Sequence, residues 1–131
     1  MFNKKKQPPI KSLIAEGSQI DGNMSFTDGL RIDGAIVGNI NAKADQASIL
    51  VISETATVTG EVHADHIIIN GTVRGPVHAC VLLELQPKAQ IQGDVHYAAL
   101  EMHQGAIVAG QLRPSMAGEE KPILKLAANN A

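Results

Sequence analysis

The sequence predicts an all-β fold, a parallel β-helix of about six stacked coils, from three features of its pattern. A five-residue frame, apolar-x-Gly-x-apolar, occurs six times, and its glycines lie 16, 22, 15, 18 and 17 residues apart. Short apolar runs with a period of two precede the frames, which is typical of strands rather than helices. A small residue stands two positions before each frame, as expected at a tight corner. Self-similarity at a nearly fixed period predicts an array of coils.

The frames also predict the core, because like positions in stacked coils lie above one another. The first apolar positions form one ladder: Ile20, Ile36, Val58, Val73, Ile91 and Val108. The last positions form a second ladder: Met24, Ile40, Val62, Val77, Val95 and Leu112. The glycines between them are Gly22, Gly38, Gly60, Gly75, Gly93 and Gly110. Adjacent strands lie about 4.8 Å apart, so six coils predict a rod about 29 Å long.

The first eleven residues are predicted to form a flexible basic arm, since they include Pro8 and Pro9 and show no periodicity. An apolar side chain beside a lysine cluster is the minimal chemistry for contact with an anionic bilayer. The candidate membrane-contact residues are Met1, Phe2, Lys4, Lys5 and Lys6. A solubilising tail is the alternative for this segment.

Residues 12–113 are predicted to be the β-helix domain. The longest glycine interval is explained by an outward loop at residues 41–48, which stacked coils tolerate. An antiparallel meander could use Asp33-Gly34 and Asn70-Gly71 as hairpin turns, but the other corners are longer and would not pair matched strands. After Arg113 the pattern stops, and residues 114–131 are predicted to be a disordered tail.

Composition narrows the function classes. The net charge is -2 and aromatic residues make up 2% of the chain, so no basic stripe with aromatics indicates a nucleic-acid partner. The single cysteine, Cys80, excludes an internal disulfide and fits a reducing cytoplasm. The basic start lacks the apolar stretch of a signal peptide, and no apolar run approaches the roughly 20 residues of a spanning helix. Any membrane contact is therefore expected to be peripheral.

No motif for catalysis or phosphate binding occurs in the sequence. His63, His78 and His96 each follow a frame glycine by three residues, so stacked coils would align them in one outward column, whereas His66 and His103 fall off this register. Such a column could bind a divalent metal, but no carboxylate is expected at a fixed place beside it, so we expect neither metal nor cofactor nor catalytic residues. A β-helical metal-dependent enzyme related to hexapeptide-repeat proteins stays an alternative, although the apolar spacing departs from the hexapeptide period.

Four runs in this chain resemble bactofilins: LRIDGAIVGNI at 30–40, GEVHA at 60–64, GTVRGPV at 71–77 and the initial MFNK. The resemblance covers residues 12–113 and extends to the arm. It implies right-handed β-helix subunits that polymerise without nucleotide into non-polar filaments at the inner membrane and position cell-wall or morphogenesis proteins. Family members often carry an aromatic residue in the last coil, where this chain has Val108.

The two ends of the predicted rod are the candidate surfaces for self-assembly. An uncapped β-helix end presents unpaired backbone groups and an apolar layer, and neither tail contains an amphipathic helix that could cover one. An interface that can be used repeatedly predicts an open filament. The candidate interface residues are Leu13, Ile20 and Met24 at one end, and Leu100, Met102, Val108 and Leu112 at the other. A monomeric scaffold whose tails cap its ends is the remaining alternative.

Overall fold

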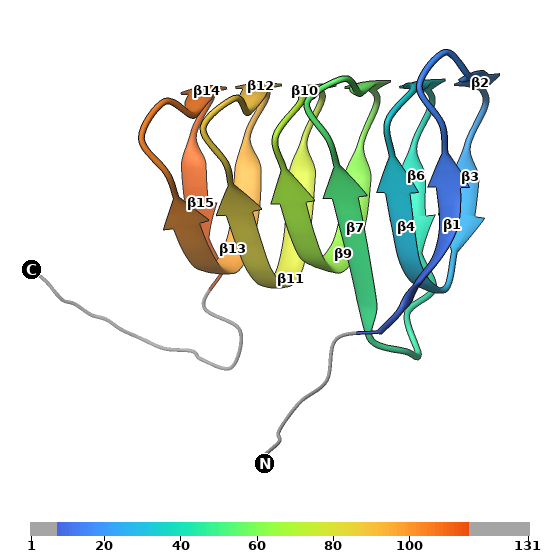
Figure 1. Ribbon diagram of the computed structural model, residues 1–131. Helices are drawn as coiled ribbons and strands as arrows, with labels where there is room; N and C mark the ends of the chain where they lie inside the picture. The colour runs from blue at the N-terminus through green and yellow to red at the C-terminus, as the bar shows by residue number, and fades with distance from the viewer. Residues whose placement is uncertain (1–7, 116–131) are drawn as a thin grey trace, which may run out of the picture.

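The computed structural model describes residues 8–115, and these form a parallel β-solenoid of about six turns (Figure 1). The expected stacked-coil architecture is confirmed: every strand pair in the described chain is parallel, and no helix occurs in it. One sheet has nine strands and the other has six. The antiparallel meander is excluded, because no two strands within residues 8–115 pair as a hairpin.

The strands follow in chain order along the axis of the solenoid. They are β1 (Ile10–Ile14), β2 (Gln19–Asp21), β3 (Met24–Phe26), β4 (Asp28–Ile32), β5 (Ala35–Val37), β6 (Ile40–Ala42), β7 (Ser48–Ile52), β8 (Thr57–Thr59), β9 (Val62–Ile69), β10 (Thr72–Arg74), β11 (Val77–Leu85), β12 (Gln90–Gln92), β13 (Val95–Met102), β14 (Ile107–Ala109) and β15 (Leu112–Pro114). The six-stranded sheet runs β2-β5-β8-β10-β12-β14 and contains one strand from each turn.

One turn shows the plan of the others. β4 ends at a corner, β5 crosses to the six-stranded sheet, and the chain bends at Gly38 into β6 before it returns to β7. The predicted ladders are confirmed by the register, because Ile36 lies between Ile20 and Val58, its neighbours in β2 and β8. Inward side chains in the middle turns are completely buried, and together they fill one continuous aliphatic core.

The bend between the two short strands requires glycine. Gly60 has a φ of 150°, a conformation that side-chain-bearing residues rarely adopt. A Cβ atom at Gly60 would also overlap the carbonyl oxygen of Gly38 on the preceding turn. Its N–H donates to the carbonyl of Arg74 on the following turn at 2.9 Å. The bend is therefore fixed by contacts with the turns on both sides.

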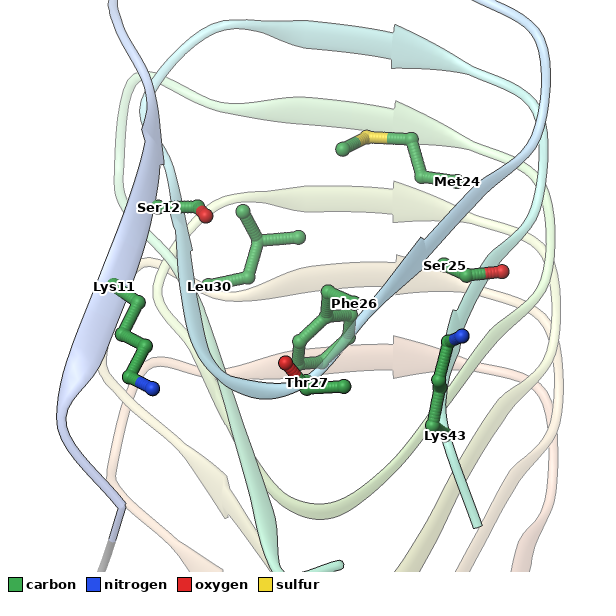
Figure 2. Close-up of a pocket in the computed structure, with 8 residues that line it drawn as sticks. All are labelled: Lys11, Ser12, Met24, Ser25, Phe26, Thr27, Leu30 and Lys43. Carbon is green, nitrogen blue, oxygen red and sulfur yellow. The ribbon is translucent and has the colours of Figure 1, made fainter.

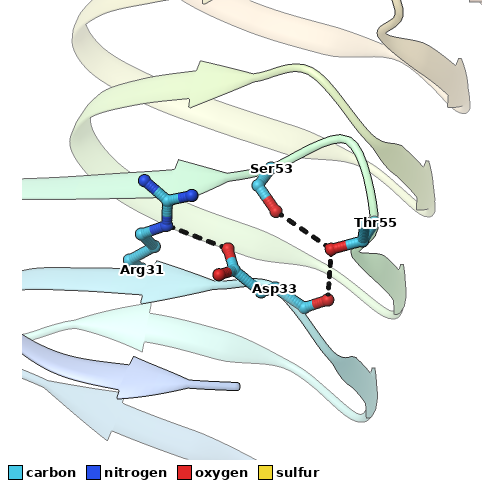
Figure 3. A network of polar contacts seen from close by, with 4 residues as sticks. All are labelled: Arg31, Asp33, Ser53 and Thr55. Atoms are coloured by element: carbon cyan, nitrogen blue, oxygen red, sulfur yellow. Dashed lines mark hydrogen bonds and ion pairs between the residues drawn. The ribbon is translucent and has the colours of Figure 1, made fainter. Parts of the chain in front are cut away.

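The corners are joined by side chains as well as by backbone. At the corner after β4, Arg31 Nε donates to Asp33 Oδ1 at 2.9 Å, and the Thr55 hydroxyl of the next turn donates to the Asp33 carbonyl at 2.7 Å (Figure 3). Hydrogen bonding by the Ser53 side chain, followed by Arg31, lowers the pKa of the Asp33 carboxyl, while partial burial opposes the shift. This network stabilises the ionised form of Asp33.

Three boundaries differ from those expected. β1 begins at Ile10, within the segment assigned to the arm, and β15 extends to Pro114. The loop expected at residues 41–48 is narrower, since β6 continues to Ala42 and β7 begins at Ser48. Ser48 is buried because its hydroxyl accepts the Asp65 N–H at 3.0 Å, which links β7 to β9. A polar residue with a partner of this kind is invisible to a search for apolar periodicity.

Candidate functional site

The N-terminal pole of the solenoid is the edge formed by β1, β2 and β3. Ile20 and Met24 occupy inward positions there, and in the described chain each strand of this edge pairs on one side only. Leu13 is also on β1, but its side chain faces outward: it pairs with the exposed Arg31 and is itself 56% exposed. The structure thus brings together two of the three predicted residues at this pole.

The inward positions of β1 are Ser12 and Ile14, which align with the buried Leu30 and Ile32. Sequence analysis missed them. The sequence does indicate the direction of these side chains, because aligning Ser-Leu-Ile at 12–14 with Leu-Arg-Ile at 30–32 places Leu13 opposite Arg31, an outward position. Phe26 is a further missed residue, since it is only 7% exposed and continues the inward row of β3.

A hollow of about 430 Å³ opens at the N-terminal pole (Figure 2). Phe26 lies in its middle near Leu30, while Lys11 and Lys43 stand on opposite sides. The Lys11 ammonium pairs with the Asp28 carboxylate at 2.9 Å. This pole therefore combines an apolar interior with a polar rim, the composition found in protein interfaces.

The C-terminal pole is formed by the end of β13, by β14 and by β15. All four predicted residues take inward positions there: Leu100, Met102, Val108 and Leu112. Their partners one turn earlier are at most 1% exposed: Leu83, Leu85, Ile91 and Val95. Met102 and Leu112 are nevertheless 44% and 46% exposed, because no described strand lies beyond them. The structure brings the whole predicted set together on one apolar end.

The predicted membrane-contact residues, Met1, Phe2 and Lys4 to Lys6, lie outside the described residues. Within residues 8–115 no helix is long and apolar enough to cross a membrane.

The histidine column predicted from the frames is present on the side of the solenoid. His63 stacks on His78 with ring centroids 4.2 Å apart and planes 8° apart, and His78 stacks on His96 at 4.4 Å and 9°. In the sheet these residues are direct partners on β9, β11 and β13. The column continues in register to Asn41 on one side and Arg113 on the other.

A carboxylate lies beside this column, contrary to the sequence-based expectation. Glu61 Oε2 is 2.7 Å from His63 Nε2 and 3.0 Å from His78 Nε2. The His63 hydrogen bond, with help from the charges of His63 and His78, lowers the pKa of Glu61. Burial lowers the pKa of His78, and its histidine neighbours add to that effect, which together outweigh the opposing influence of Glu61. Near neutral pH the site therefore contains an ionised carboxylate and a neutral His78.

Comparison with known proteins identifies the family of the chain. No curated protein and no solved structure matches it. The family model for bactofilins, described as polymer-forming cytoskeletal, matches residues 12–113, which is the range predicted for the β-helix domain. With a solenoid of the expected kind over the same residues, this chain belongs to the bactofilin family of polymer-forming cytoskeletal proteins.

Proposed function

We propose that this bactofilin is a cytoskeletal scaffold whose subunits stack end to end, without nucleotide, into non-polar filaments at the inner membrane. The observation that carries the proposal is the apolar C-terminal pole, where Met102 and Leu112 are about half exposed although their equivalents inside the rod are fully buried. Burial of that layer against another subunit is favourable by the hydrophobic effect alone. No nucleotide is needed for such a junction.

The non-polar arrangement follows from two junctions of different kinds. Each junction would join the same pole of two copies, so that each is an isologous contact around a two-fold axis. The N-terminal pole presents Ile20, Met24 and the hollow around Phe26. The C-terminal pole presents a more uniform aliphatic layer. Two different surfaces that alternate along the rod produce a filament without polarity.

The arm places the filament on the membrane in this proposal. Phe2 and the lysines at 4–6 supply one apolar anchor and three positive charges per subunit. A filament repeats the arm along its length, so later contacts become intramolecular and avidity rises by about 10² to 10⁴. On the membrane the polymer would position proteins of cell-wall synthesis or morphogenesis.

Electron microscopy of the full chain, purified and imaged without nucleotide, tests assembly directly. Variants that block one pole test the polarity. With Met102→Arg at the C-terminal pole, a non-polar filament reduces to dimers joined by their N-terminal poles, and Met24→Arg gives dimers of the opposite kind. In a polar filament every junction uses both poles, so either variant gives monomers.

Sedimentation velocity separates these outcomes, and circular dichroism verifies that each variant is folded. Dimers from both single variants and monomers from the double variant support the proposal. Monomers from both single variants would refute the non-polar arrangement. A monomeric wild-type chain at all concentrations would refute assembly itself and leave the monomeric scaffold as the function.

A further inference from the structure

We propose that Glu61, His63 and His78 form a zinc-binding site on the side of the solenoid. One ligand atom from each residue lies within 4.8 Å of the ligand atoms of the other two. Two imidazole nitrogens and one carboxylate oxygen form a donor set that suits Zn²⁺, and three protein ligands leave the fourth tetrahedral position to water. The site is independent of the proposed assembly, because β9 and β11 belong to interior turns of the solenoid and lie at neither pole.

The Glu61 carboxylate is free to face the histidines because of the residue at the equivalent position one turn later. Residues that follow the bend glycines form a ladder in which a side-chain oxygen accepts the backbone N–H of the next turn. Asn23 Oδ1 accepts from Asn39 and Asn39 Oδ1 accepts from Glu61, at 2.9 and 3.0 Å. The next residue in this ladder is Pro76, which has no N–H to donate.

Because Pro76 interrupts the ladder, the Glu61 carboxylate turns toward the histidines instead. The ladder resumes one turn later, where Asp94 Oδ1 accepts the Gln111 N–H at 2.9 Å. The Asn39 side chain meanwhile holds the backbone of Glu61 in place. One proline thus leaves a carboxylate at a fixed point beside the column, which is the element that a bare row of histidines lacks.

Metal binding requires a small rearrangement of the two rings. The planes of His63 and His78 are 8° from parallel, whereas a zinc ion lies about 2.0–2.1 Å from each nitrogen and close to each ring plane. Both rings must therefore tilt toward a common point near Glu61. The side chains are 41% and 29% exposed, which leaves room for this movement. His96 stacks on His78 but has no contact with Glu61 among the described contacts, so it stays outside the site.

A second cluster in the described chain provides a matched control. Glu84, Glu101 and His103 also bring three ligand atoms together, but this group has one imidazole, and Glu101 and His103 are exposed. His103 Nε2 is 3.5 Å from Glu84 Oε2, a longer separation than those at Glu61. Zinc favours the group richer in nitrogen donors.

The test is calorimetric titration with Zn²⁺ alone, on the full chain purified without an affinity tag and treated with a chelator. We expect one zinc per subunit. Loss of a hydrogen-bond partner of a metal ligand weakens metal binding by about 10- to 100-fold at known sites. His78→Ala and Glu61→Gln remove ligands themselves, so they should weaken zinc binding by at least that much. His103→Ala and His96→Ala should bind as the wild type does. Circular dichroism is expected to show unchanged folding, because all of these side chains lie on the outer surface.

Binding that survives His78→Ala would overturn the proposal, and so would binding that disappears with His103→Ala. No saturable binding by the wild-type chain would overturn it as well. Filament formation is measured on the same samples. A chain that assembles without binding zinc refutes this site alone, whereas a chain that binds zinc without assembling refutes the proposed function alone.

Discussion

Val108→Arg at the C-terminal pole is expected to abolish filament formation, leaving dimers joined by their N-terminal poles, at concentrations where the wild type forms filaments. Full burial of an aliphatic side chain contributes about 1.5–3 kcal/mol, so completing the burial of Met102 and Leu112, 44% and 46% exposed, contributes about 1 kcal/mol each. Across a junction of two copies that is about 4 kcal/mol. An unpaired charge placed inside such a contact costs about 3–5 kcal/mol.

Since each 1.4 kcal/mol changes an equilibrium about tenfold, a cost of about 3–5 kcal/mol should raise the critical concentration by about 10²- to 4 × 10³-fold. Quantitative sedimentation over a concentration series measures it. The matched control is Val37→Arg, the same substitution at a 47% exposed outer position of an interior strand, which should leave the critical concentration unchanged. The reasoning is refuted if folded Val108→Arg sediments like the wild type, or if both variants lose assembly equally.

Three further predictions concern the arm, the bend and a corner. Deletion of residues 2–6 should abolish flotation with anionic liposomes, and Val108→Arg should weaken it, because the dimers that this variant leaves carry two arms instead of the many along a filament; equal flotation of all three proteins would contradict both expectations. Gly60→Ala should lower the stability of the fold, measured by urea unfolding, more than Gly17→Ala does. Both residues have positive φ, so an alanine costs about 1–3 kcal/mol at either, but of the two only Gly60 also faces the backbone of a neighbouring turn. A smaller effect at Gly60 would contradict the stacking argument. The lowered pKa of Asp33 means that its ionised form stabilises the fold above the usual value of 3.8 and that this contribution is lost as the pH falls through the lower folded-state pKa, so Asp33→Asn should reduce stability at pH 7 and converge with wild type in strong acid; a difference that stays constant with pH would show that charge plays no part.

Most of the fold could be predicted from the sequence because the core positions repeat. Aligning the frame glycines is enough to place Ile36 between Ile20 and Val58, and the structure has this register. Apolar periodicity failed to predict two kinds of position: apolar side chains that face outward, and polar side chains that are buried with a hydrogen-bond partner. Leu13 is apolar yet faces outward, and Ser48 is polar yet buried through its bond to Asp65. Apolar character alone does not specify the direction of a side chain.

The histidine site was likewise predictable only in part. The histidine column was predictable, because its three members share one position relative to the frame glycine. The role of Glu61 was not predictable, because the position after the frame glycine holds asparagine, glutamate, proline and aspartate in successive turns, without a repeating residue type. What the structure adds is the hydrogen-bond direction along this ladder, and with it the consequence of Pro76. A break in a polar ladder becomes visible only when donors and acceptors are placed in space.

The geometry of stacked coils also determines which backbone pairing a non-polar junction could use. Inside the rod each turn continues the parallel ladder of the one before, on every side of the coil. Two copies related by a two-fold axis perpendicular to the rod have the same handedness, but their facing edge strands run in opposite directions and could pair only as antiparallel strands. Antiparallel strands exchange backbone hydrogen bonds as well as parallel ones do, so edge-strand pairing and burial of the apolar layer would both contribute to such a junction. A charge in the apolar layer is expected to oppose both contributions, because it must be desolvated before the two ends can meet, whereas the same charge on the outer face of an interior strand stays in water.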